Sequence, residues 1–304
     1  MIALFAPGQG SQTPGMLTPW LELPGAVDRI ALWSKASGLD LLRLGTTATA
    51  EEITDTAVTQ PLVVAAALLA FAEIPQDSLP GDTIVAGHSV GELAAAAVAG
   101  VISADDAVAL AALRGAEMAK ACALEPTGMS AVLGGDEAAV LARLEELGLI
   151  PANRNAVGQI VAAGRLDALA ELADSAPEKA RVRALPVAGA FHTAFMAPAQ
   201  DAVAAAIAKI VPGEPVRTLL SNFDGKPVAS GQDAIDKLAA QVTRPVRWDL
   251  CTETVRAAGV SAVAELPPAG TLVGIAKREL KGTPNLALKT PADIPALVEL
   301  TATD

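Results

Sequence analysis

The residues best suited to chemistry lie in the segment 87–92, which reads Gly-His-Ser-Val-Gly-Glu. A short run rich in β-branched residues, 82–86, precedes this segment, and an alanine-rich run, 93–99, follows it. A strand, a Gly-x-Ser-x-Gly turn and a helix in succession lift the serine hydroxyl clear of a sheet, so Ser89 is predicted to be a nucleophile. Side chains in place of the two glycines would collide across the turn. The alternative is an ordinary β-to-α turn in which the serine caps the helix.

A serine nucleophile needs a general base, and the chain has only two histidines, His88 and His192. His88 directly precedes the serine, where neighbouring side chains diverge, which leaves His192 as the candidate. Its ordinary pKa of roughly 6.5 suits proton transfer near neutral pH. The alternative for His192 is a half-buried histidine bonded to a main-chain carbonyl. We favour the base because Ser89 supplies a nucleophile.

The composition predicts a soluble α/β protein with an aliphatic core. Hydrophobic residues make up 52% of the 304 residues and aromatic residues only 3%, so Ala, Val, Leu and Ile must fill the core. The longest apolar run, Leu62 to Ala72, is well short of the roughly 20 residues of a membrane-spanning helix. Cys122 and Cys251 have neither a disulfide framework nor metal-ligand spacing, and the N-terminus lacks a basic secretory region. We therefore expect a cytoplasmic location, no membrane partner and no metal.

The charge of the chain bears on its partners. A formal net charge of −12 argues against nucleic acid, because a concentrated basic patch would be needed to overcome phosphate repulsion. Two small basic clusters occur, at 179–183 and at 277–281. Such clusters are more often solvated faces than binding sites.

The order of the expected elements favours an α/β fold. Residues 2–6 read as a buried strand, and the glycine-rich loop 8–12 after it lacks the third glycine of a dinucleotide fingerprint. Such a loop can instead present a main-chain N–H to a developing oxyanion. Helices are expected over 25–44, 62–73 and 103–122.

The pattern changes in the middle of the chain. Strands at 129–133, 150–153, 159–163 and 182–187 and helices at 137–147 and 166–174 follow one another in the order βαββαβ. We interpret 125–187 as a ferredoxin-like small domain inserted into an α/β-hydrolase-like catalytic domain formed by 1–124 and 188–304. His192 is then expected at the junction of the two domains, where ligand sites concentrate.

Arg114 lies in the middle of an alanine-rich helix. It is either a surface residue paired with Glu117 or a buried cation. The sequence pattern alone favours the surface pair.

Together these motifs resemble the malonyl-CoA:acyl-carrier-protein transacylases, and the resemblance runs through the whole chain. Each motif is weak alone, but the set in this order is highly specific. The motifs are Gly-Gln-Gly-Ser-Gln at 8–12, Thr-Gln-Pro at 59–61, the segment 87–92, Arg114 with Met118, Asn-Arg-Asn-Ala-Val-Gly-Gln at 153–159, Ala-Phe-His at 190–192, and Gln241 with Pro-Val-Arg-Trp at 245–248.

The resemblance implies a role for each matching residue. Ser89 would carry the acyl group as an oxyester, and His192 would act as base and then as acid. Arg114 would hold the malonyl carboxylate in a bidentate pair, which reverses the preference for a surface pair. The main-chain N–H groups of Gln9 and Val90 would form the oxyanion hole.

Four further roles follow from the same resemblance. The main-chain carbonyl of Gln241, rather than a carboxylate, would orient the histidine, and Asn153 would lie near it. Gln60 would line the acyl pocket. Val90 and Phe191 match members of the family that use malonyl rather than methylmalonyl units.

The chain departs from the family pattern at two places. Thr-Ala-Phe at 193–195 replaces the usual small polar residue and proline, and Pro-Pro-Ala-Gly at 267–270 replaces a late Gly-Pro-Gly loop. Neither departure touches the implied chemistry, although Phe195 is expected to alter the pocket rim.

The implied reaction moves a malonyl group from malonyl-CoA to the phosphopantetheine thiol of holo acyl carrier protein, through a malonyl-serine intermediate. The product would serve fatty acid or polyketide synthesis. No cofactor is expected, because the phosphopantetheine belongs to the partner. The acidic carrier protein would dock on one of the two basic clusters, and we favour 277–281. The alternatives are a serine esterase or thioesterase that uses water as acceptor, and a non-catalytic protein that binds acyl-CoA.

Overall fold

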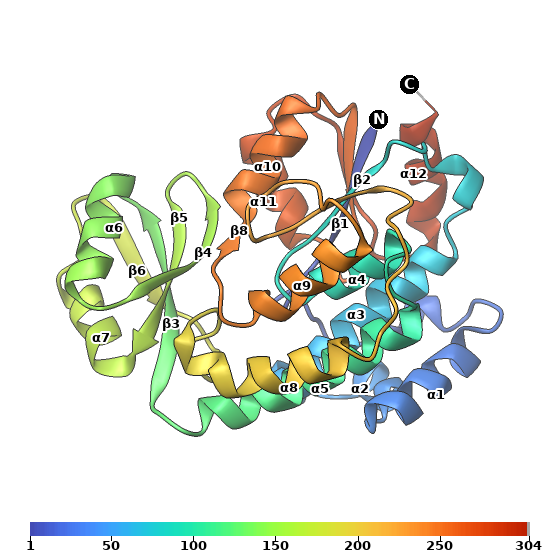
Figure 1. Ribbon diagram of the computed structural model, residues 1–304. Coiled ribbons are helices and arrows are strands. Elements are labelled where there is room, and N and C mark those ends of the chain that lie inside the picture. Colours follow the sequence, from blue (N-terminus) through green and yellow to red (C-terminus); the bar gives the residue numbers. More distant parts are fainter. Residues whose placement is uncertain (303–304) are drawn as a thin grey trace.

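The structure of the protein is a computed structural model that describes residues 1–302. It contains two five-stranded sheets (Figure 1). The strands of the first sheet are β1 (Ile2–Ala6), β2 (Ile84–Gly87), β7 (Thr218–Leu220), β9 (Ala262–Glu265) and β10 (Asn285–Ala287). They are all parallel and lie in the order β10-β9-β1-β2-β7. Strand β2 leads into Ser89, so this residue lies at the carboxyl end of an inner strand, where α/β proteins place their ligand sites.

Helices cover both faces of the first sheet. They are α1 (Ala26–Ser37), α2 (Leu41–Thr46), α3 (Thr56–Ala72), α4 (Gly91–Val98), α5 (Ala104–Cys122), α8 (Ala197–Ile207), α9 (Gly231–Gln241), α10 (Trp248–Ala257), α11 (Thr271–Glu279) and α12 (Ile294–Thr301). Leu4 and Ala6 join one core with α3, α4 and α5, whereas Ala3 and Phe5 join a second core with α10 and α11. This alternation follows from the two-residue period of a strand. No helix within residues 1–302 is long and apolar enough to cross a membrane.

The second sheet lies to one side of the first, and α6 and α7 belong to it (Figure 1). Its elements are β3 (Thr127–Gly134), α6 (Glu137–Glu146), β4 (Ile150–Ala156), β5 (Gln159–Arg165), α7 (Leu166–Asp174), β6 (Ala180–Ala184) and β8 (Val246–Arg247). The strand order is β6-β3-β5-β4-β8, antiparallel except for the β4–β8 pair. The expected succession βαββαβ is present, and β8 adds a strand from a distant part of the chain.

Several boundaries differ from the expected ones. The helix expected over 25–44 is divided into α1 and α2, because Gly38 adopts a left-handed conformation with φ of 72° and Asp40 caps α2. Strand β6 ends at Ala184, because the chain turns where Val187 N donates to Leu185 O at 2.9 Å. Helices α10 and α12 and strands β8 and β10 are present in the structure but are not predicted from the sequence.

Helix α3 begins earlier than the sequence pattern indicates. The pattern predicts a start at Leu62, whereas α3 begins at Thr56. The Asp55 carboxylate accepts a hydrogen bond from Ala57 N at 2.8 Å and so caps the helix ahead of its proline. The proline removes one main-chain hydrogen bond, which the burial of the following turns offsets. The earlier start makes Gln60 a buried helical residue.

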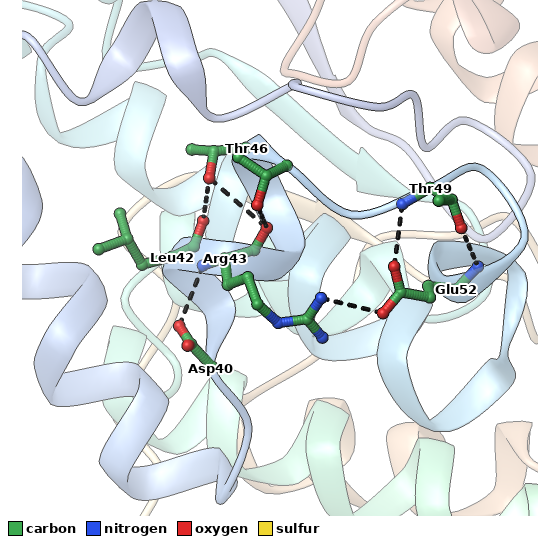
Figure 2. Close-up of polar contacts among 7 residues, drawn as sticks. Asp40, Leu42, Arg43, Thr46, Thr49 and Glu52 are labelled. Atoms are coloured by element: carbon green, nitrogen blue, oxygen red, sulfur yellow. Dashed lines mark hydrogen bonds and ion pairs between the residues drawn. The ribbon is translucent and has the colours of Figure 1, made fainter.

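The segment before α3 is held by polar contacts around Glu52 (Figure 2). The Glu52 carboxylate accepts from Thr49 N at 3.0 Å and from Arg43 Nη1 at 2.9 Å, and these two contacts lower its pKa. The Thr49 hydroxyl in turn accepts from Glu52 N at 3.2 Å, and Asp40 Oδ1 accepts from Arg43 N at 3.0 Å. These contacts fix the short turn Glu52–Thr54 that leads into α3.

Gly115 allows α3 and α5 to approach closely, and this packing can be tested. A Cβ at Gly115 would lie 2.6 Å from Thr56 O and 3.3 Å from Gln60 Cβ. Gly115→Ala should therefore destabilise the protein by roughly 1–3 kcal/mol in urea unfolding, although alanine favours helices. Gly274→Ala in α11 is the control, because a Cβ there meets no atom within 4 Å. The control should be neutral or stabilised by up to about 1 kcal/mol, and equal effects of the two variants would contradict the steric argument.

Candidate active site

The nucleophile turn has a strained conformation that two glycines and one asparagine maintain. Ser89 has a φ of 55°, in the left-handed region that non-glycine residues seldom adopt. A Cβ on Gly87 would lie 2.1 Å from the Gly91 carbonyl, and one on Gly91 would lie 2.3 Å from Ala6 O. Ser89 N donates to Asn222 Oδ1 at 2.8 Å, and Asn222 Nδ2 donates to Gly87 O at 2.7 Å. Asn222, which follows β7, therefore ties together both ends of the turn.

His192 lies within hydrogen-bond distance of the serine. Its Nε2 is 2.8 Å from Ser89 Oγ, and its Nδ1 is 3.0 Å from Gln241 O. A carbonyl oxygen can only accept, so Nδ1 carries the proton and Nε2 presents its lone pair to the hydroxyl. Burial, followed by the positive charge of Arg114, lowers the pKa of His192 to about 3. The imidazole is therefore neutral near pH 7 and able to accept a proton.

Arg114 is the third polar group at the serine, and it is only 3% exposed. Its Nη1 donates to Gln60 Oε1 at 2.6 Å, and its Nη2 donates to Gln241 Oε1 at 2.8 Å and to Ser89 Oγ at 3.3 Å. Burial lowers the pKa of Arg114 to about 10, so the guanidinium stays charged near neutral pH. Its close partners are neutral carboxamides, so the cation can still take an anionic group beside Ser89.

The surface pair that the sequence pattern favours for Arg114 is wrong. Glu117 instead accepts from Lys120 Nζ at 2.7 Å on the exposed side of α5. The face of α5 that carries Arg114 turns toward α3 and the end of α9, where the two carboxamides lie. The buried cation implied by the family resemblance is the arrangement that the structure contains.

The orientation of both carboxamides is determined by their other contacts. Gln60 Nε2 donates to Met118 Sδ at 3.5 Å, so its oxygen faces Arg114. Gln241 Nε2 donates to Ser89 O at 2.9 Å and to Glu92 Oε2 at 2.6 Å, so its oxygen also faces Arg114. Gln241 thus contacts the nucleophile and the arginine through its side chain and the histidine through its main chain.

Glu92 and Asn222 support the site, and the sequence analysis did not identify them as site residues. Glu92 is 4% exposed, and its Oε1 accepts from Asn222 N at 2.6 Å. Burial raises the pKa of Glu92 to about 7. Two signals in the sequence point to these residues, namely a single acid within an alanine-rich helix and an asparagine close to the end of a strand.

The predicted oxyanion donors lie on two segments that meet at the turn. Gln9 follows β1, and Val90 is the N-cap of α4. A Cβ on Gly8 would lie 2.4 Å from His88 O, which shows how closely the loop after β1 approaches the turn. Within residues 1–302, the main-chain N–H groups of Gln9 and Val90 donate no hydrogen bond. Both are therefore available to a ligand, and their role as an oxyanion hole stays a prediction.

Within residues 1–302, no hydrogen bond joins Asn153 or Phe191 to the ring of His192, which bonds Ser89 and Gln241. Asn153 lies on β4, and its buried Oδ1 has no hydrogen-bond partner in the described part of the chain. Its neighbour Asn155 instead bonds His88, with Oδ1 2.8 Å from Nε2. Phe191 is buried in the main core. The roles of Asn153 in histidine orientation and of Phe191 in substrate choice remain predictions.

The two departures from the family pattern do not bond the reacting groups. Phe195 packs, partly buried, against the main core. The loop 267–270 leads into α11 and is held by Glu265, whose buried carboxylate accepts from Gly270 N at 2.9 Å and Leu272 N at 3.1 Å. Both features therefore have structural partners of their own.

A cavity of about 350 Å³ adjoins the nucleophile turn. Its walls include Gln9 and His88 on one side, Asn153 and Val161 of the second sheet on the other, and Leu272 of α11. The cavity thus lies between the two sheets, beside the loop that carries the predicted oxyanion donor. Residues 1–302 contain no group of three His, Cys, Asp or Glu side chains placed to hold a metal ion.

Comparison with known proteins first defines the class. The family described as "Acyl transferase domain" matches residues 4–295. A curated "Malonyl CoA-acyl carrier protein transacylase" of Mycobacterium tuberculosis is 70% identical over 302 residues, which cover 99% of this chain and 100% of that protein.

Solved structures give the same result. The crystal structure of MCAT from Mycobacterium tuberculosis has a TM-score of 0.96 at 70% identity and covers 98% of this chain and 99% of that one. A malonyl-transacylase in complex with a type II PKS acyl-carrier protein has a TM-score of 0.89 at 31% identity, with 98% and 99% covered.

The mixed α/β fold with two sheets, together with the domain match, defines an acyl transferase. Within that class, the chain belongs to the malonyl CoA-acyl carrier protein transacylase family. The family expected from the motifs is therefore confirmed.

The charge of Arg114 should affect the pH dependence of Ser89 acylation. Because this charge is the second cause of the low pKa of His192, Arg114→Ala should raise that pKa while burial still holds it below its ordinary value. With acetyl-CoA, which has no carboxylate to neutralise the arginine, the acidic limb of the acylation rate should move to higher pH in the variant. Lys120→Ala, which removes an exposed charge from the same helix, should leave the limb unchanged. Identical acidic limbs in all three proteins would contradict this coupling.

Proposed function

We propose that this chain transfers a malonyl group from malonyl-CoA to the phosphopantetheine thiol of holo acyl carrier protein through a malonyl ester of Ser89. The observation that carries the proposal is the position of Arg114, whose Nη2 lies 3.3 Å from Ser89 Oγ. A buried cation at this distance matches an acyl group whose free carboxylate is separated from the reacting carbonyl by one methylene group. An ester hydrolase for neutral acyl groups has no use for such a charge.

The first half-reaction forms the acyl-enzyme. Ser89 Oγ attacks the thioester carbonyl carbon while its proton passes to His192 Nε2, along the 2.8 Å contact. The main-chain N–H groups of Gln9 and Val90 hold the negative oxygen of the tetrahedral intermediate. The carbon–sulfur bond then breaks, and the imidazolium returns the proton to the sulfur of CoA.

The second half-reaction runs the same steps toward a new acceptor. The phosphopantetheine thiol gives its proton to His192, and its sulfur attacks the ester carbonyl. Ser89 leaves as the alkoxide and takes the proton back from the histidine. The Gln241 carbonyl keeps Nδ1 protonated in both halves, so Nε2 is the atom that accepts the proton and, in the imidazolium, returns it.

The malonyl carboxylate also assists the base. When this carboxylate pairs with Arg114, its negative charge offsets the positive charge of the guanidinium, which otherwise lowers the pKa of His192. The histidine therefore becomes a stronger base when an acyl group with a carboxylate is bound. Selectivity and proton transfer are coupled through the same guanidinium.

The surrounding residues fit the proposed substrate. The cavity of about 350 Å³ beside Gln9 and His88 is open to the pantetheine arm of CoA or of the carrier protein. Gln60 orients Arg114, and the buried side chains of Val90 and Phe191 limit the acyl pocket to malonyl rather than branched units.

We also propose that the chain consists of two domains. We describe 1–124 and 188–304 as an α/β-hydrolase-like catalytic domain, supported by the parallel sheet and the strained serine turn. We describe 125–187 as a ferredoxin-like small domain, supported by its βαββαβ succession and the antiparallel order β6-β3-β5-β4. Strand β8 joins the second sheet from the catalytic domain.

The proposed partners are malonyl-CoA and an acyl carrier protein, with neither nucleic acid nor a membrane involved. A related transacylase was solved in complex with a type II PKS acyl-carrier protein, which supports a carrier protein as acceptor. We propose a cytoplasmic location and a role in fatty acid or polyketide synthesis. The reaction needs no resident cofactor, because the phosphopantetheine belongs to the carrier protein.

Intact mass measurement after brief exposure to malonyl-CoA tests the function. A malonyl adduct should form, map to the peptide containing Ser89, persist in water and disappear when pantetheine or holo carrier protein is added. Ser89→Ala should form no adduct. Rapid loss of the adduct in water would support the thioesterase alternative, and no adduct from malonyl-CoA or acetyl-CoA would support the non-catalytic one.

Arg114→Ala should relax the acyl selectivity of the enzyme. Loss of the guanidinium leaves the malonyl carboxylate unpaired in a buried site, which costs roughly 2–4 kcal/mol, or about thirtyfold to a thousandfold in kcat/KM. The value for acetyl-CoA should fall much less, because acetyl makes no ion pair. Lys120→Ala is the matched control and should keep the parent ratio. A malonyl preference that survives in Arg114→Ala would show that the arginine is structural.

A further inference from the structure

Glu92 is a buried acid that the proposed reaction does not use. It belongs to α4, two residues after Val90, and is 4% exposed. Its Oε1 accepts from Asn222 N and its Oε2 accepts from Gln241 Nε2, each at 2.6 Å. Within residues 1–302 it forms no ion pair, so its partners are neutral donors. An acid in such a position needs an explanation, because burial of a carboxylate without a cation is costly.

The hydrogen bonds of Glu92 determine which way the Gln241 carboxamide points. One N–H of Gln241 Nε2 meets Glu92 Oε2 and the other meets Ser89 O at 2.9 Å. Gln241 Oε1 is then left to accept from Arg114 Nη2 at 2.8 Å. The opposite orientation would set the carboxamide oxygen against the carboxylate and its N–H groups against the guanidinium. Glu92 accepts on both oxygens, as an ionised carboxylate does, and this ionised form excludes the opposite orientation.

The geometry points to Glu92 as a positioning residue for acyl selectivity, which acts through the Gln241 carboxamide to hold Arg114 ready for the malonyl carboxylate. This inference rests on the proposed function and adds a residue that determines specificity without touching the substrate. The path consists of two hydrogen bonds, from Gln241 to Glu92 and from Arg114 to Gln241.

Glu92 and Arg114 do not bond each other directly, because the Gln241 carboxamide lies between them. The carboxylate favours the charged form of Arg114 and so opposes the effect of burial on its pKa. A direct ion pair would supply more attraction but would occupy the N–H groups that the substrate needs. With a carboxamide between them, the acid stabilises the cation, and N–H groups of the guanidinium stay available to an incoming carboxylate.

Glu92→Gln tests this role with minimal change in shape. If the new oxygen accepts from Asn222 N, the new NH₂ faces Gln241 Nε2, donor against donor. Gln241 must then rotate its carboxamide, which turns its oxygen away from Arg114 Nη2, or lose the contact that fixes its orientation. In either case Arg114 keeps its bond to Gln60, but the Gln241 oxygen no longer holds it in one position. The ratio of kcat/KM for malonyl-CoA to that for acetyl-CoA should therefore fall roughly tenfold, because one charge-assisted hydrogen bond no longer positions the arginine.

Glu265→Gln is the matched control. Glu265, the last residue of β9 in the first sheet, is also a fully buried acid. Its carboxylate accepts from main-chain N–H groups at the start of α11. Its loss should lower the midpoint of thermal unfolding but leave the malonyl-to-acetyl ratio within twofold of the parent. The pair of variants separates selectivity from the general cost of altering a buried carboxylate.

A double-mutant cycle with Gln241→Ala identifies the path and covers the case in which Glu92→Gln folds poorly. Gln241→Ala removes the carboxamide but keeps the carbonyl that accepts from His192. It should lower the malonyl-to-acetyl ratio by itself. Because Glu92 acts through this carboxamide, the double variant should show no further loss of the ratio beyond Gln241→Ala.

Two results would overturn the inference. One is a parent-like malonyl-to-acetyl ratio in Glu92→Gln or in Gln241→Ala. The other is additive losses in the double variant, which would mean that Glu92 acts by a separate route. Failure of the proposed function is distinguished by the parent protein itself, which would then form no malonyl-Ser89 adduct.

Discussion

The structure of the site depends on Gln241, which bonds each of the groups around Ser89. Its carbonyl fixes the tautomer of His192, and its carboxamide bonds Ser89, Glu92 and Arg114. Gln241 is the last residue of α9, so its carbonyl accepts no hydrogen bond from within the helix. It accepts from Arg244 N at 3.2 Å and has a second lone pair for a side chain. The helix terminus thus supplies the acceptor that a carboxylate provides in a serine triad. One residue therefore bonds the proposed base, the proposed nucleophile and the cation proposed to bind the substrate.

A neutral acceptor for the histidine has an electrostatic consequence. A carboxylate at Nδ1 would raise the pKa of His192, whereas the carbonyl leaves burial and Arg114 to lower it to about 3. The free enzyme therefore holds a neutral base next to a buried cation. The neutral histidine is not repelled by the guanidinium. Within residues 1–302, Arg114 carries the only formal charge that contacts Ser89. A carboxylate bound to Arg114 would then change the field at the histidine directly.

The parts of the site that the sequence predicts are those with local causes. The Ser89 turn follows from two glycines whose Cβ atoms would collide with the main chain, and the cap at Ser103 starts α5 as expected, since its side chain accepts from Asp106 N at 3.0 Å. The burial of Arg114 has no local cause, because an arginine with Glu117 three residues on is equally suited to a surface. Its burial depends on Gln60 and Gln241, which are distant in the sequence and became relevant only through the family resemblance. Long-range elements were missed for the same reason, as the short strand β8 shows, since it joins the second sheet beside β4 from a distant part of the chain.

Neutral partners for Arg114 offer a reason for the selectivity of such a site. If a carboxylate of the protein paired directly with the guanidinium, the substrate would have to displace it, and the exchange of one ion pair for another would favour malonyl only slightly. Carboxamides instead satisfy part of the N–H groups and leave the charge itself uncompensated at close range. A malonyl carboxylate then gains most of the available attraction, whereas an acetyl group leaves the cation as it was. The buried charge keeps one of these carboxamides in place because α3 packs closely on α5 at Gly115, next to the Gln60 that bonds Arg114.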